Sequence, residues 1–140
     1  MNSPNAFYQR CGIAIVLLHA LVSVAHGAAH SALNISMSDW QNLYILLVIF
    51  LLPLVAGLLL WRGARTGFHI LFLSMLGSLL FGGYYHFVLS GPDNVNSLLV
   101  HRWTLPFQIC AVLLALIEAA GAIVGIAGIL QRPDNKPMGR

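Results

Sequence analysis

Four long apolar stretches divide the chain, and short polar segments separate them. A helix needs about 20 mostly apolar residues to cross the hydrocarbon layer of a membrane. The pattern predicts helices over residues 11–33, 40–61, 66–89 and 104–130, with polar tails at 1–10 and 131–140. We therefore expect a single all-α membrane domain of residues 1–140 that crosses the bilayer several times, without a separate soluble domain.

The second stretch has the clearest boundaries, because a tryptophan stands at each end. Trp40 and Trp61 are 21 positions apart. A helical rise of ~1.5 Å per residue converts that spacing to ~31 Å, about the thickness of the hydrocarbon layer. Indole rings favour the two membrane interfaces. The spacing therefore predicts a complete transmembrane helix.

The connections between the stretches are short, which predicts an antiparallel up-down four-helix bundle. Basic residues concentrate at one side of that bundle: Arg10, Arg62, Arg65, Arg132, Lys136 and Arg140. Lysine and arginine favour the cytoplasmic side, so both termini are expected there, in a bacterial-type cytoplasmic (inner) membrane. A cleaved signal peptide ending near residues 25–27 is the alternative for the first stretch. Its histidines weigh against cleavage.

Composition supports the same class of protein. Hydrophobic residues make up 59% of the 140 residues and charged residues 8%, with a mean hydropathy of +0.83. Soluble domains carry roughly a quarter charged residues, and a small domain cannot hide this much apolar surface. The lipid bilayer is therefore an expected partner. The net charge of +3 is small and dispersed, so nucleic acid is not an expected partner. Cys11 and Cys110 are predicted to lie on opposite membrane sides and to form no disulfide.

Histidines inside the apolar stretches are the main candidates for chemistry, because polar side chains are costly in a membrane. His19, His26 and His30 lie seven and four residues apart in the first stretch. At ~100° per residue they fall on one stripe about 40° wide. Two histidines four apart on a helix can bind one metal ion from the same face. The stripe is therefore expected to face the bundle interior.

Two further histidines are expected at the height of His26 and His30. His86 lies about one turn inside the outer end of the third helix, and His101 lies just outside the fourth. We therefore predict a metal site on the non-cytoplasmic side, with His26, His30, His86 and His101 as ligands. Imidazole ligands suit copper, zinc, iron or nickel.

Glu118 is expected near the membrane midplane, where an unpaired carboxylate costs several kcal/mol. Its helix face carries only small residues, and Gly121 and Gly125 form a G-x-x-x-G pair that permits close helix packing. Glu118 therefore should point into the bundle, where His19 reaches a similar depth. We expect the two side chains to meet, as a second shell to the metal or as a proton relay.

Three functions follow from these residues. The first is a metal centre for redox or oxygen chemistry, or for handling metal ions or protons. The second is a haem b (or chlorophyll-type) electron-transfer protein with His30 and His86 as axial ligands. The third is an accessory subunit of a larger membrane complex, or a homo-oligomer, whose histidines only form hydrogen bonds. His69, near the cytoplasmic end, is interpreted as an interfacial residue. The sequence leaves open whether the protein is an enzyme.

Overall fold

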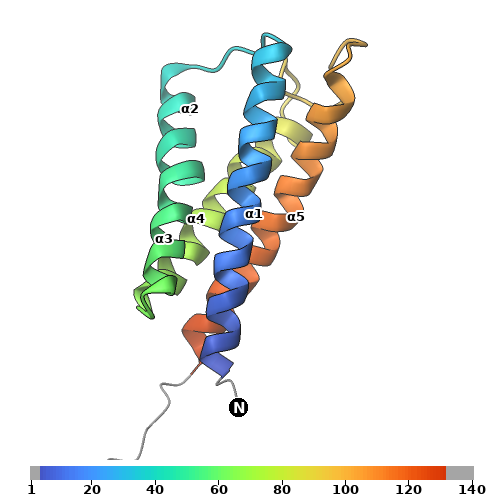
Figure 1. Ribbon diagram of the computed structural model, residues 1–140. Coiled ribbons are helices and arrows are strands. Elements are labelled where there is room, and N and C mark those ends of the chain that lie inside the picture. Colours follow the sequence, from blue (N-terminus) through green and yellow to red (C-terminus); the bar gives the residue numbers. More distant parts are fainter. Residues whose placement is uncertain (1–3, 132–140) are drawn as a thin grey trace, which may run out of the picture.

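The computed structural model describes residues 4–131, which form helices and connections without any strand in that range (Figure 1). Its elements are α1 (Pro4–Ala32), α2 (Asp39–Tyr44), η1 (Ile45–Leu51), α3 (Leu52–Trp61), α4 (Thr66–Gly83), η2 (Tyr84–Val88) and α5 (Thr104–Leu130). Four continuous helical runs are long and apolar enough to cross a membrane: Ala6–Ala32, Asp39–Trp61, Thr66–Val88 and Thr104–Leu130. The prediction of four such helices is confirmed.

The predicted start of the first helix is wrong. α1 begins at Pro4, ahead of the apolar run that starts at residue 11. Proline suits the first turn of a helix, where its missing N–H has no intrahelical partner to lose. The polar residues up to Arg10 then continue the same helix, so most of the predicted tail 1–10 is helical. The basic residues Arg132, Lys136 and Arg140 lie outside the described residues.

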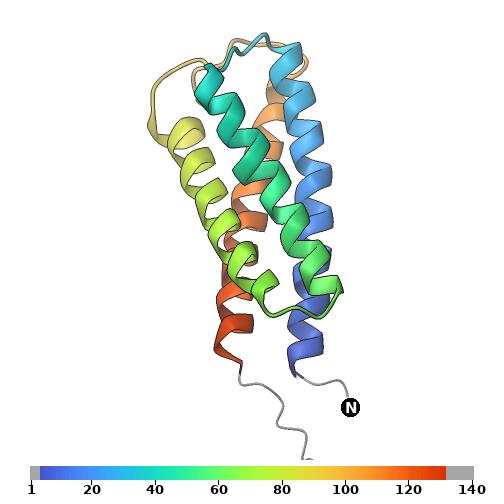
Figure 2. The same ribbon diagram turned by 90° about the vertical axis from the view of Figure 1, so that its left-hand side faces the viewer.

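The helices pack side by side, with α5 against both α1 and α4, and α3 against both α1 and α4. The beginning of α1 and the end of α5 lie at the same end of the bundle (Figures 1 and 2). We call this end the inner end and the opposite one the outer end. Toward the outer end η1 stays packed on α4, whereas α1 makes at most slight contact with α2 and η1. α2 accordingly diverges from α1 there (Figure 1).

The inner half holds the apolar core, in which Leu60, Phe68, Leu71 and Met75 are almost completely buried. Glycines on α5 bring this helix close to α4. A β-carbon added at Gly125 would lie 2.8 Å from the backbone of Phe72. Small residues are the usual means of close helix contact in membranes, where lipid removes the hydrophobic drive between helices.

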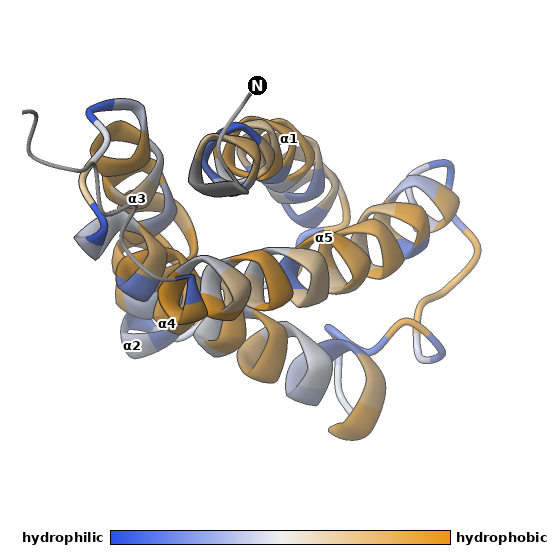
Figure 3. Ribbon diagram, turned by 90° about the horizontal axis from the view of Figure 1, so that it is seen from below, coloured by the Kyte–Doolittle hydropathy of each residue, from blue (hydrophilic) through white to orange (hydrophobic). Residues whose placement is uncertain are grey.

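The outward faces of the helices are apolar. Leu17, Leu46 and Leu116 expose 65%, 60% and 62% of their surface. Seen from below, the helices are largely in the colours of hydrophobic residues (Figure 3). Soluble monomers rarely expose large contiguous apolar patches. The surface therefore matches an apolar surrounding such as lipid.

Two π-helical segments lie in the outer half: η1 stands between α2 and α3, and η2 ends the helical run of α4. Their wider turn is visible at η2, where the N–H of Leu89 donates to the carbonyl of Tyr84, 2.8 Å away. Single π turns within α-helices frequently occur at functional sites, because they redirect side chains. η2 carries His86.

The close contact of α4 and α5 predicts a strong effect of Gly125→Val. The new side chain would collide with backbone atoms of Phe72, which cannot rotate away. The free energy of unfolding is therefore expected to fall by about 1–3 kcal/mol. Gly83→Ala is the matched control, since an added β-carbon there meets nothing within 4 Å. Thermal unfolding in detergent, followed by circular dichroism, should show a lower midpoint for Gly125→Val only. Equal midpoints for both variants would contradict the packing role of Gly125.

Candidate metal centre

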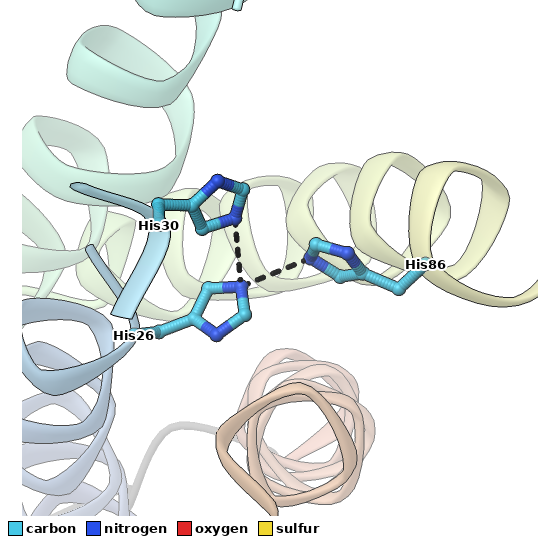
Figure 4. Close-up of side chains that lie close together, drawn as sticks. All are labelled: His26, His30 and His86. Carbon is cyan, nitrogen blue, oxygen red and sulfur yellow. Dashed lines mark hydrogen bonds between the residues drawn. The ribbon is translucent and has the colours of Figure 1, made fainter. Parts of the chain in front are cut away.

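Three histidines from two helices meet in the outer half of the bundle. His26 and His30 lie one turn apart on α1, and His86 faces them from η2 (Figure 4). The Nε2 atom of His26 lies 3.1 Å from Nε2 of His86 and 3.2 Å from Nε2 of His30. Each residue offers one nitrogen, and the three nitrogens lie within 4.8 Å of one another. Three of the four predicted ligands therefore converge.

The two separations from His26 match those between ligands of a single metal ion. Nitrogens bound at ~2.0–2.1 Å in tetrahedral geometry lie about 3.3 Å apart, close to both contacts of His26. Without a cation, Nε2 of His26 has either one hydrogen or one lone pair to offer, and two neighbouring nitrogens compete for it. A metal ion would engage a lone pair from each ring. The cluster can therefore hold a metal ion.

Asp93 contacts two of the three histidines. The Nδ1 atom of His86 lies 3.0 Å from the backbone oxygen of Asp93 and 3.2 Å from its Oδ1. The same Oδ1 lies 3.2 Å from Nε2 of His30. When Nδ1–H of His86 donates to Asp93, the lone pair of His86 is on Nε2, which faces the cluster. A carboxylate in this position orients a histidine ligand and raises its basicity.

The connection between η2 and α5 folds back to hold Asp93 in place. The N–H of Val95 donates to the carbonyl of His86 at 3.0 Å, and the amide of Gln108 donates to the carbonyl of Val95 at 2.7 Å. The Nδ2 atom of Asn94 donates to the carbonyl of Leu89 at 3.0 Å. Asp93 is consequently only 8% exposed, although it belongs to a loop.

Phe107 of α5 packs against all three imidazoles. Its ring centroid lies 4.7 Å from that of His26, 5.0 Å from His30 and 5.4 Å from His86. The side chain is completely buried, so it shields the cluster from solvent on that side. Sequence reasoning assigned no role to Phe107 or Asp93. The Gly-Pro turn before Asp93 marks a loop, but neither residue has a spacing that indicates a site.

The fourth predicted ligand, His101, does not join the group. It is exposed in the loop before α5, and its Nδ1 accepts a hydrogen bond from the N–H of Trp103 at 3.3 Å. The sequence placed it only by height along the bundle, and the turn at Trp103 binds it on the outside. His69 is exposed near the inner end of α4, away from the cluster.

The alternative haem site requires a flat macrocycle between His30 and His86, with the iron bound on both faces. The Nε2 atom of His26 lies 3.2 Å from Nε2 of His30 and 3.1 Å from Nε2 of His86. An imidazole thus fills the space that the macrocycle would need. The arrangement favours a single ion over haem.

His19 and Glu118 form a second buried polar contact, deeper in the bundle. Nε2 of His19 lies 3.2 Å from Oε1 of Glu118, and the residues are 1% and 4% exposed. The expected meeting of the two side chains is therefore present. A β-carbon on Gly82 would lie 3.9 Å from Oε2 of Glu118 and 3.7 Å from the ring of His86. The carboxyl group and the ring of His86 thus both lie beside Gly82, and the role of Glu118 as second shell or proton relay stays a prediction.

The buried contact of His19 predicts strong coupling with Glu118. Removing one partner leaves the other buried without a hydrogen bond, which costs about 1–3 kcal/mol. Removing both partners leaves no buried polar group without a hydrogen bond at this contact. His19→Leu and Glu118→Leu should therefore each lower the free energy of unfolding, and the double variant should lower it by less than their sum. A double-mutant cycle from denaturant unfolding measures this, and strict additivity would refute the coupling.

The contacts of Asp93 predict weaker metal binding in Asp93→Ala. Asp93 lies behind His86, and loss of a carboxylate behind a histidine ligand typically lowers metal affinity by about 10–100-fold. Asp39→Ala, at the first turn of α2, is the control. Competition with a chelating dye for zinc measures both affinities. Equal affinities would show that Asp93 does not support the ligands.

Comparisons with known proteins gave no match to this chain among protein-family models, curated proteins or solved structures. The case for a function therefore rests on the side chains themselves. These are three convergent imidazoles, a carboxylate that contacts two of them, and a buried histidine–glutamate contact below.

Proposed function

We propose that this protein is a multi-pass membrane protein that binds one transition-metal ion through His26, His30 and His86. The observation that carries the proposal is the convergence of their three nitrogens within 4.8 Å of one another. Imidazole ligands suit copper, zinc or iron. Asp93 would act behind His86, through its contact with Nδ1 of that ring.

The metal centre would face the non-cytoplasmic side of a bacterial-type inner membrane. Arg62 and Arg65 lie in the α3–α4 connection, at the end of the bundle opposite the histidines. Arg65 also donates to the carbonyl of Ile129, 3.2 Å away, near the C-terminus of α5. A positive charge is stabilising at a helix C-terminus. Basic residues are typical of cytoplasmic loops. This supports an antiparallel up-down bundle with both termini in the cytoplasm.

The centre is proposed to act on a bound molecule. Structural zinc sites use four protein ligands, whereas catalytic zinc sites use three and leave a position for water or substrate. Three histidines converge here, and a cavity of about 390 Å³ adjoins them. Glu118 lines the same cavity and contacts His19, so this pair can exchange protons with a molecule bound there. These features support redox or other metal-assisted chemistry with coupled proton movement.

The proposal predicts one metal ion per chain in protein purified from the membrane of its expression host. His26→Ala, His30→Ala and His86→Ala each remove one of three ligands, so each variant should lose most of the metal. His69→Ala is the control, because it removes a histidine from the same helical run as His86 but outside the cluster. Elemental analysis by mass spectrometry measures the metal content.

His101→Ala distinguishes a site of three histidines from the four-histidine site that the sequence predicts. A metal content equal to that of the unaltered protein is expected, since His101 lies outside the group of three. Metal-free protein, after purification without chelators and incubation with copper, zinc and iron salts, would refute the proposed function. A Soret band in the purified protein would instead support the haem alternative.

A further inference from the structure

The cavity beside the histidines has polar groups at both ends and an apolar wall between them. His26, His30 and His86 line its outer end, and Glu118 and Ser78 its inner end. Most of the remaining wall is apolar, with Ile45, Ile49, Phe50 and Leu114 among its residues. Its volume of about 390 Å³ falls within the range of small-molecule pockets, roughly 300–1,000 Å³. The volume thus suits a small organic molecule.

The cavity opens sideways, between α1 and the helical run of α2 and η1. Val24 lines the cavity and is 59% exposed, and Gly27 and Asn42 are lining residues that are also exposed. α1 makes at most slight contact with α2 and η1 at this level. At the outer end Ile35 and Met37, from the α1–α2 connection, form part of the wall. The opening therefore lies on a face that a membrane would cover with lipid.

Polar atoms at the inner end are placed to receive an oxygen-bearing group. Ser78 is completely buried, and its hydroxyl has no hydrogen-bond partner among the described residues. Oε1 of Glu118 is held by His19, while Oε2 lies 3.9 Å from the β-carbon position of Gly82. A buried hydroxyl without a partner is costly, so a ligand that supplies one is favoured. A hydroxyl or carbonyl group can do so.

We infer that this cavity binds a lipid-soluble small molecule with an apolar body and one hydroxyl or carbonyl group, which enters sideways from the bilayer. The apolar wall matches the body, and the polar group lies between the histidine cluster and Glu118. A volume equal to that of about 13 waters, at ~30 Å³ each, accommodates one ring with its substituents. Any longer apolar tail remains among the lipids. This inference rests on the proposed metal function, because it names the class of molecule on which the metal centre would act.

Binding of para-nonylphenol to the full-length protein in lipid nanodiscs tests the inference. Nonylbenzene, which lacks the hydroxyl, is the matched ligand. Equilibrium dialysis measures how much of each compound the protein-loaded nanodiscs retain beyond empty ones. One saturable site for the phenol, and none for nonylbenzene, is expected.

Two cavity-filling variants locate the bound molecule. Gly27 and Gly83 both line the cavity, and an added β-carbon at either meets nothing within 4 Å. Gly27→Leu and Gly83→Leu therefore fill the cavity from opposite sides without collision at the new β-carbon. Each excludes the equivalent of two or more methylene groups of the ligand, so affinity for the phenol should fall about tenfold or more. Ala28→Leu is the control, because Ala28 is exposed on α1 and does not line the cavity.

The metal content of every variant is measured in parallel. Loss of phenol binding in Gly27→Leu and Gly83→Leu, with binding retained in Ala28→Leu, supports the inference. Unchanged phenol affinity in both filling variants, or equal uptake of nonylbenzene, overturns it. A chain that binds no metal but takes up the phenol in a Gly27-dependent manner refutes the proposed function and still supports the cavity as a ligand site. Metal bound without any phenol site refutes the inference alone.

Discussion

The cost of leaving a polar side chain without a partner in apolar surroundings is the constraint on which this structure depends. A buried hydroxyl or imidazole without a hydrogen bond costs several kcal/mol in a medium that offers no water. The described part of α1 carries three histidines on one stripe, and all three find polar partners on other helices or loops: Glu118, His86 and Asp93. These contacts fix the rotation of α1 about its axis, since any other rotation would expose imidazoles to lipid.

The two halves of the bundle meet different requirements. In the inner half, glycines on α5 and large apolar side chains on α4 give close packing. In the outer half, α1 separates from η1 and leaves a cavity beside the histidines. The π-helical turns of η1 and η2 both border this region. A closely packed base with an open outer half would keep the three histidines in position while leaving space for a second molecule.

The polar groups also follow one another along the length of the bundle. The exposed loop end leads to Asp93, then to the histidine cluster, then across the cavity to Glu118 and His19. Phe107 closes one side of the cluster. Low-dielectric surroundings strengthen each electrostatic contact, so a metal ion here would be held by few ligands yet strongly influenced by Asp93. The cavity would bring its ligand next to both a metal and a carboxyl group.

The sequence alone determined the four helical runs, since apolar length fixes which segments can span a bilayer. Helical spacing also placed His26 with His30, and depth counting placed His86 and the His19–Glu118 contact. Only the tertiary structure decided the rest. Asp93 reaches the site because the η2–α5 connection folds back through hydrogen bonds from Val95 to His86 and from Gln108 to Val95. His101, in the same connection, is exposed and bonded to Trp103. Periodicity describes a helix face, but a loop has no periodicity. Its path depends on hydrogen bonds to the ends of the flanking helices, which helical spacing does not predict, and the position of Asp93 depends on that path.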